Sequence, residues 1–327
     1  MRLTDCGRSK LVKHDIRLSG PQARGARISS RVLAELTKRL TDTMTRVVRF
    51  AADGRSNLQR CPEWVVSAVE FDIVGLAEGS TVLTIEQKTL GEVAPTIFSQ
   101  YSLPLWQDNT LQPSMSSLDL LRLTFQDASN KNVESDRLDR NILASIHDFE
   151  SVLSLGFDAI SLLQDIGPVG NGAQATLDRK DLEAVETLRQ AAPPNQKTIV
   201  SGTLDELAGS RRSFIVQLSN YKQVRGILPS GDLADFARLF NRKVVVDGEA
   251  VFRPSGQLAH VVANAIHAAT DQDVVWETIP KPAAISADAI RVRSRLVHES
   301  NHLALIRDKW PGDESEEDVL RALEAIS

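Results

Sequence analysis

Hydrophobic positions recur with two different periods along the first 190 residues, and together they predict helices packed on strands. Residues 13–18 alternate between apolar and polar side chains, as half-buried strands do. The β-rich runs 64–74 and 81–87 flank a turn that contains glycine and serine, which predicts a hairpin. Apolar residues spaced by three or four predict helices at 28–52, 117–128, 136–164 and 178–191. This order of elements is typical of a two-layer α/β domain with extra helices.

The pattern changes after the proline-containing linker 191–196. Five short runs rich in Val, Ile, Leu and Phe predict strands at 198–207, 212–219, 222–228, 243–252 and 257–267. A brief helix that ends near Phe240 separates the third strand from the fourth. Three strands, a helix and two strands are the element order of an OB-fold, although an SH3-like barrel or a mixed α+β domain has the same local pattern.

A second linker, 278–287, precedes a predicted helix at 288–308 and a short final helix after Trp310. We therefore predict an α+β protein in three parts. Residues 1–192 form the two-layer α/β domain with extra helices, and residues 196–270 form an OB-like five-stranded β-barrel. Residues 284–327 form a helical C-terminal tail.

Composition narrows the class of protein further. The chain has 327 residues, of which 42% are hydrophobic and 25% charged, as is typical of globular proteins. No run of about 18 apolar residues occurs, so we expect no membrane contact. Cys6 and Cys61 are too few for a disulfide framework or a four-cysteine zinc site, which favours the reducing cytoplasm. Because the chain has no phosphate-binding glycine loop and no G-x-S-x-G motif, we predict no cofactor and no enzymatic activity.

The formal net charge of −5 hides a strong asymmetry along the chain. Residues 1–60 contain 14 Lys or Arg against 5 Asp or Glu, a net charge of +9. Residues 61–195 contain 8 against 20, a net charge of −12. An asymmetry of this kind indicates charged partners more clearly than the total does.

The excess of cations follows the predicted helix 28–52 and the residues just before it. Apolar residues such as Leu36 and Met44 fall on one side of that helix. The opposite side carries the candidate nucleic-acid-binding residues Arg24, Arg27, Arg31, Lys38, Arg39, Arg46 and Arg49. A cationic strip about 30 Å long suits a phosphate backbone, which guanidinium groups bind in bidentate fashion. The same pattern fits a solvated helix face, or a face that meets an acidic protein or the chain's own acidic segment.

The predicted barrel offers a second candidate surface. OB-folds bind single-stranded nucleic acid through basic grooves that carry aromatic stacking platforms. Tyr221 and Arg225 share the solvent-facing side of the third strand, whereas Phe214 shares a side with core residues. One tyrosine and a few arginines make a small platform, so a barrel used for protein contacts is the alternative.

Residues 298–302 match the H-E-x-x-H motif of zinc-dependent peptidases. His298 and His302 would share a helix face and ligate zinc, and Glu299 would activate the metal-bound water. The match resembles those peptidases over these five residues only. Nearby arginines, and the position of Glu299 within an apolar stripe, favour an ordinary surface or interface helix.

Three hypotheses for the function follow. The leading one is a non-enzymatic accessory protein that contacts nucleic acid through the arginine face and, as an additional surface, the barrel. The second is a protein-interaction or neutralising partner of another protein. It would use the acidic segments and the C-terminal helix, whose apolar stripe is Val319, Leu320, Leu323 and Ile326. The third is a zinc metallopeptidase that uses residues 298–302.

Overall fold

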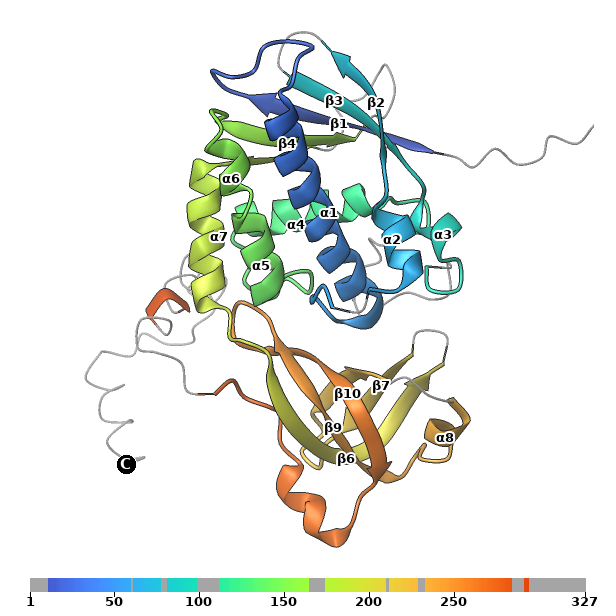
Figure 1. Cartoon of the computed structure of the whole chain (residues 1–327). Helices are drawn as coiled ribbons and strands as arrows, with labels where there is room; N and C mark the ends of the chain where they lie inside the picture. The colour runs from blue at the N-terminus through green and yellow to red at the C-terminus, as the bar shows by residue number, and fades with distance from the viewer. Residues whose placement is uncertain are drawn as a thin grey trace, which may run out of the picture.

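The computed structural model describes residues 11–59, 61–77, 81–98, 112–164, 174–209, 212–228, 233–283 and 291–293. It confirms an α+β protein, with helices and two separate sheets. Figure 1 shows an N-terminal region in which helices cover one sheet, and a closed sheet that lies beyond the far ends of those helices. The predicted C-terminal tail, apart from residues 291–293, lies outside the described residues.

The sheet of the N-terminal region is fully antiparallel, with strand order β2-β3-β1-β4-β5. Its strands are β1 (Val12–Ser19), β2 (Asp72–Ala77), β3 (Thr81–Gln87), β4 (Ala159–Gln164) and β5 (Gln174–Asp178). The alternation of β1 sets which side of the sheet is buried. Ile16 and Leu18 point into the core, whereas Lys13 and Arg17 are exposed on the opposite side. The central strand thus has one face for the helices and one face for solvent.

Seven helices of the described chain belong to this region. They are α1 (Ser30–Asp53), α2 (Glu63–Val69), α3 (Leu90–Val93), α4 (Ser117–Ser129), α5 (Arg140–His147), α6 (Glu150–Leu153) and α7 (Arg179–Ala191). Their ends carry the expected signals. The Ser29 side chain accepts a hydrogen bond from the Val32 amide at the start of α1, and Gly54 ends that helix with a left-handed φ of 67°.

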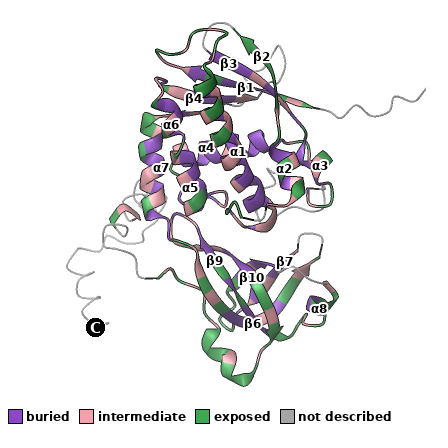
Figure 2. Ribbon diagram, in the orientation of Figure 1, coloured by how far each residue is buried: buried purple, intermediate pink, exposed green. Residues whose placement is uncertain are grey.

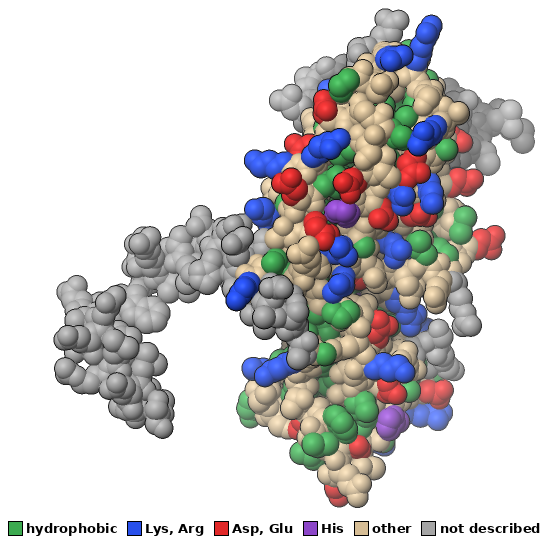
Figure 3. Space-filling view, turned by 60° about the vertical axis from the view of Figure 1, so that its left-hand side comes forward, with side chains coloured by type: hydrophobic (Ala, Val, Ile, Leu, Met, Phe, Trp, Pro, Cys, Tyr) green, Lys and Arg blue, Asp and Glu red, His purple; other side chains and the backbone are tan. Residues whose placement is uncertain are grey.

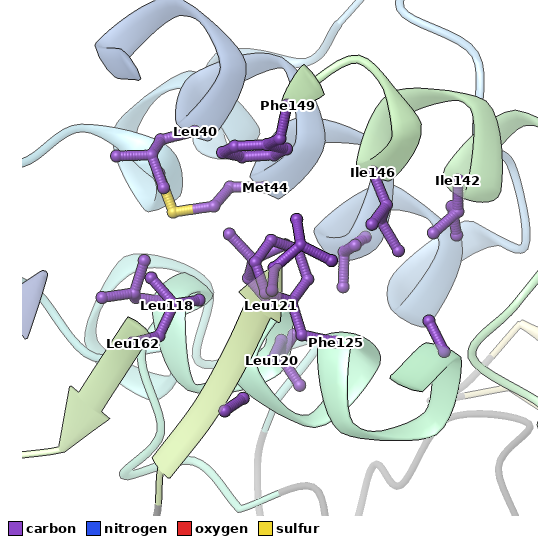
Figure 4. Close-up of a cluster of buried hydrophobic side chains, with 14 of the residues drawn as sticks. Leu40, Met44, Leu118, Leu120, Leu121, Phe125, Ile142, Ile146, Phe149 and Leu162 are labelled. Carbon is purple, nitrogen blue, oxygen red and sulfur yellow. The ribbon is translucent and has the colours of Figure 1, made fainter. Parts of the chain in front are cut away.

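The core of the N-terminal region lies where α1, α4 and α5 meet the sheet (Figure 4). Phe125 of α4 and Phe149 pack edge to face, with ring centroids 5.4 Å apart. Leu40 and Met44 of α1 lie beside Phe149, on the inward side that the sequence predicts. Figure 2 shows that buried residues lie on the sides of the helices and strands that face one another, and that exposed residues lie on the outer sides.

The second sheet closes on itself, with strand order β10-β8-β7-β6-β9 and a further pairing between β9 and β10. Its strands are β6 (Gln196–Ala208), β7 (Ser213–Gln217), β8 (Gln223–Ile227), β9 (Lys243–Phe252) and β10 (Leu258–Ala268). The helix α8 (Leu233–Ala237) connects β8 to β9, and the 3-10 helix η1 (Asp271–Trp276) follows β10. All pairs are antiparallel except β8 with β10, which is parallel.

Two predicted elements of the N-terminal region are wrong. The run 64–74 is mainly the helix α2, because Val65, Ala68 and Val69 bury one helical face and β2 begins only at Asp72. The long helix predicted over 136–164 is two short helices, α5 and α6, and the second ends at Leu153, before Gly156 with its left-handed φ of 99°. The residues after it form β4, which pairs with β1 and β5.

Candidate nucleic-acid interface

The predicted arginine face of α1 divides into two halves with different surroundings. Arg24, Arg27, Arg31 and Lys38 are exposed, at or near the end of α1 that lies away from the closed sheet (Figure 1). Arg39 in the middle of the helix is already paired. Its guanidinium lies 2.7 Å from the Glu35 carboxylate and 3.4 Å from that of Asp148.

The half of α1 nearest the closed sheet does not point into solvent, contrary to the expectation for Arg46 and Arg49. Arg49 is only 4% exposed, and its Nη1 donates to the carbonyl of Asn57 at 2.6 Å and to that of Gln59 at 2.8 Å. Arg46 is half-buried and donates to the Ser56 carbonyl at 2.6 Å. Both side chains hold the loop after α1 in place, so the strip is not continuous. The sequence spacing predicts their side of the helix correctly but not the loop that covers it.

The charges visible on the N-terminal region are mixed rather than of one sign. Figure 3 shows Lys and Arg side chains interspersed with Asp and Glu over the described part of this face. Some of these opposite charges are paired with each other. Arg189, for example, donates two hydrogen bonds to Glu186. The same hydrogen bonds lower the pKa of Glu186. A mixed surface of this kind attracts a polyanion less than the net charge of +9 over residues 1–60 implies.

The turn between β7 and β8, together with the outward side of β8, forms the second candidate surface. Tyr221 lies at that turn with a left-handed φ of 61° and an exposed fraction of 85%. Gln223 and Arg225 follow on alternate positions of β8, with exposed and half-buried side chains respectively. Phe214, by contrast, is buried in the interior of the closed sheet, as predicted. We call Tyr221, Gln223 and Arg225 the β8 surface.

A cavity of about 540 Å³ adjoins the β8 surface. Gln223 and Arg225 form one side of it, and the loop between β9 and β10 forms another. A third side comes from residues 279–282, which the sequence predicts as a linker. Lys281 and Gln257 therefore belong to the site, although the sequence analysis did not name them. The apolar Ile279, which lies between Thr278 and Pro280, is the sequence signal that this linker packs against the sheet.

The β9–β10 loop is fastened to the N-terminal region, which fixes the orientation of the β8 surface. Arg253 donates to the Asp136 carboxylate at 2.6 Å and lies 3.6 Å from that of Glu134. These two carboxylates neutralise the Arg253 charge. Arg253 therefore links the β9–β10 loop to the segment between α4 and α5. The backbone amide of Ser255 also donates to the Val133 carbonyl at 3.0 Å.

A buried histidine completes the junction between the closed sheet and α1. His260 of β10 lies 5.4 Å from the Phe50 ring, centroid to centroid, and its Nε2 is 3.0 Å from the Gly54 carbonyl oxygen. Burial lowers the pKa of His260 to about 4. The ring is therefore neutral near pH 7 and donates its single proton to Gly54. No pattern in the sequence predicts this contact between residues that are 206 positions apart.

One serine, one histidine and one aspartate meet in the core of the N-terminal region. His14 Nε2 lies 2.7 Å from Ser116 Oγ and 3.9 Å from an oxygen of Asp119, and all three side chains are buried. A nucleophilic triad needs the carboxylate on the other ring nitrogen. Here the serine and the aspartate form the capping box of α4 and share Nε2. The arrangement therefore stabilises a helix start and has no nucleophile open to solvent.

The H-E-x-x-H residues His298, Glu299 and His302 lie outside the described residues, so the geometry of this motif stays a prediction. Among the residues with a described placement, no group of three or more His, Cys, Asp or Glu side chains is arranged to hold a metal ion. Nor is any helix in that part of the chain long and apolar enough to cross a membrane.

Comparisons with known proteins add little to this geometry. No protein-family model matches the chain, and no curated protein matches it. A chain from the solved structure of U. maydis replication protein A bound to ssDNA is similar at 18% identity, over 36% of this chain and 88% of that chain, with a TM-score of 0.17. At that TM-score the likeness supports neither a fold nor a function for this chain.

Proposed function

We propose that this protein is a non-enzymatic, cytoplasmic accessory protein that contacts nucleic acid through the β8 surface, and that its closed sheet is an OB-type barrel. The element order supports the second point. Three strands, the helix α8 and two strands follow one another, and the third strand pairs in parallel with the fifth. In OB-folds the second and third strands, with the loops that flank them, bind oligonucleotides.

The single observation that carries the binding proposal is the exposure of Tyr221 at the turn that leads into β8, the strand whose Arg225 lines the adjoining cavity. An aromatic ring that is 85% exposed offers a face on which any base can stack. Arg225 and Lys281 supply positive charge along the path of a phosphate backbone. Gln223 offers its amide group to base edges or to the sugar, whereas the Gln257 amide already donates to Glu134 at 3.3 Å.

The exposed half of the α1 face remains a second, separate contact in this proposal. Arg24, Arg27, Arg31 and Lys38 are placed to meet phosphates at the other end of the N-terminal region. Arg46 and Arg49 are not part of it, because their guanidinium groups serve the loop after α1. Contact with single strands therefore depends on the β8 surface, and any contact with a duplex depends on the exposed end of α1.

Fluorescence anisotropy with a labelled single strand of about 12 nucleotides and with a matched duplex tests the proposal. We expect single-strand binding that weakens as salt rises. The Tyr221→Ala change should weaken it by about tenfold through the loss of one stacked base. Arg225→Ala should reduce the slope of log affinity against log salt by about 0.7.

Two substitutions serve as matched controls. Phe240→Ala removes another exposed aromatic ring, in the turn between α8 and β9, and Arg17→Ala removes an exposed arginine of β1. Both should leave the affinity unchanged. Absence of salt-sensitive binding to either oligonucleotide at low ionic strength overturns the proposal, and so does an equal loss of affinity in the control variants.

A further inference from the structure

A second groove, of about 720 Å³, lies on the outside of the closed sheet and has no role in the proposed function. Its floor consists of residues 196–199 of β6 and Asp247 of β9. One wall is Trp276 at the end of η1, and the other is residues 278–281. Residues 279–281 also border the cavity beside the β8 surface, so they separate the two hollows.

The walls of this groove are fixed by hydrogen bonds and one ion pair. The Gln196 side chain donates to the Lys281 carbonyl at 2.5 Å and accepts from the Ala283 amide at 2.8 Å. Lys243 of β9 lies 2.9 Å from the Glu277 carboxylate and holds the end of η1. The groove is therefore present before any ligand arrives, which removes part of the entropic penalty of binding.

Apolar side chains remain exposed on the floor and the rim. The exposed fractions are 38% for Ile199, 55% for Val274, 69% for Val275 and 43% for Trp276. Figure 3 shows hydrophobic side chains gathered on the part of the closed sheet farthest from the N-terminal region. Exposed apolar side chains in and next to a groove indicate a surface that another segment can cover.

The charged groups around the groove are of both signs. Lys197 and Lys281 are exposed lining residues, whereas Asp247 of the lining and Glu249, which lies opposite Lys197 in the register of β6 and β9, are carboxylates. An occupant with an apolar stripe therefore fits the apolar rim, and carboxylates beside that stripe can pair with the two lysines.

The C-terminal sequence of the same chain has this pattern. Val319, Leu320, Leu323 and Ile326 recur with helical spacing. Five carboxylates come directly before them, Asp313, Glu314, Glu316, Glu317 and Asp318. The last described residue, Arg293, donates to the Ala191 carbonyl at 2.7 Å, five positions before Gln196 on the groove floor. The 26 residues from there to Val319 can extend to about 80 Å, so they reach the groove easily.

We propose that residues 313–326 dock in this groove in cis, with the apolar stripe against Ile199 and Trp276 and the carboxylates toward Lys197 and Lys281. The groove then has a defined internal ligand, and any external partner would have to displace it. This proposal is independent of nucleic-acid binding at the β8 surface.

Hydrogen exchange of the full-length chain, followed by mass spectrometry of peptides that cover 315–327, tests the docking. We expect the amides of 319–326 to exchange at least about tenfold more slowly than in a free peptide. Ile199→Asp should restore fast exchange there, because it puts a charge on the groove floor. Leu323→Asp should do the same from the side of the tail, without touching the closed sheet. Val66→Asp is the matched control, since Val66 is 57% exposed on α2 in the N-terminal region.

Three outcomes overturn the proposal. One is exchange of 319–326 at the free-peptide rate in the wild-type chain. Another is slow exchange of residues 319–326 that persists in the Ile199→Asp variant, provided that this variant has the same thermal unfolding midpoint as the wild type. The third is protection that disappears on hundredfold dilution, because a second copy of the chain would then occupy the groove.

Discussion

The two ends of α1 carry the same kind of residue at the same spacing, yet their arginines do different things. At the start of the helix, Arg27 and Arg31 are exposed to solvent. At its end, Arg49 is buried, and its guanidinium donates to the backbone carbonyls of Asn57 and Gln59. The end of α1 meets the closed sheet through Gly54 and His260, whereas the start of α1 has no described contact with that sheet.

This difference shows what helical periodicity can and cannot establish. The period places a residue on a side of the helix. It does not include the loop that returns over that side. Residues 54–59 follow the helix, and the carbonyl groups of Ser56, Asn57 and Gln59 accept hydrogen bonds from Arg46 and Arg49. Arginines on a helix face therefore stabilise the fold, and are not available to a ligand, wherever a neighbouring loop of the same chain places carbonyl acceptors beside them.

The largest effect should come from the glycines that flank the two ends of α1. Gly54 and Gly25 both have a left-handed φ, of 67° and 63°. A Cβ at Gly54 would lie 2.4 Å from His260 Nε2, whereas a Cβ at Gly25 would meet nothing within 4 Å. We expect Gly54→Ala to lower the free energy of unfolding by about 4 kcal/mol and Gly25→Ala by about 1 kcal/mol, measured by urea denaturation. Equal losses would mean that the closed sheet is not packed tightly against α1.

A smaller loss should follow from removing the buried guanidinium. Arg49→Ala leaves the carbonyls of Asn57 and Gln59 without their donor, so we expect the free energy of unfolding to fall by about 3 kcal/mol. Arg31→Ala, at the exposed end, should change it by no more than about 0.5 kcal/mol. Urea denaturation of both variants measures the difference. A negligible loss in Arg49→Ala would show that this arginine does not hold the loop.

The next effect is a pH dependence that originates at the junction. Burial lowers the pKa of His260 from 6.5 to about 4, so between these values the unfolded chain binds the proton more tightly than the folded chain. The stabilisation is complete above pH 6.5 and is lost as the pH falls toward 4. Between about pH 7.5 and about pH 5 we expect the wild type to lose about 2 kcal/mol through this ring.

The His260→Gln variant should lack that part of the pH dependence, whereas His267→Gln, at an exposed position of β10, should retain it. Thermal or urea unfolding at the two pH values provides the measurement. The comparison with the variant also separates His260 from Asp139, because burial raises the pKa of Asp139 and so acts in the opposite direction. Identical pH profiles for wild type and His260→Gln would contradict the account of the junction.

Much of the closed sheet could be predicted from the sequence because its strands are short, alternate regularly and end at clear turn residues. Residues 243–252 match β9 from end to end, and the position of α8 between the third and fourth strands is also as expected. The exposed side of β8 was predictable for the same reason, since Gln223 and Arg225 alternate with the buried Val224.

The rest depended on contacts between distant parts of the chain. The helix α2 is rich in Val and Trp, which favour strands, and its burial against the core overrides that preference. Residues 278–283 look like a linker because of their prolines, yet the Gln196 side chain binds them to β6. The cavity and the groove are both built from that segment, so neither could be inferred from local pattern.

The central claim is that single-stranded nucleic acid meets the β8 surface rather than the arginine face of α1. Photo-cross-linking of the full-length chain to a bromodeoxyuridine-containing single strand, with mass spectrometry of the joined peptides, tests it most directly. The account predicts cross-links at Tyr221 and its neighbours in 219–228, and their loss in Tyr221→Ala. Cross-links confined to residues 24–39 of the α1 region, or none at low salt, would contradict it.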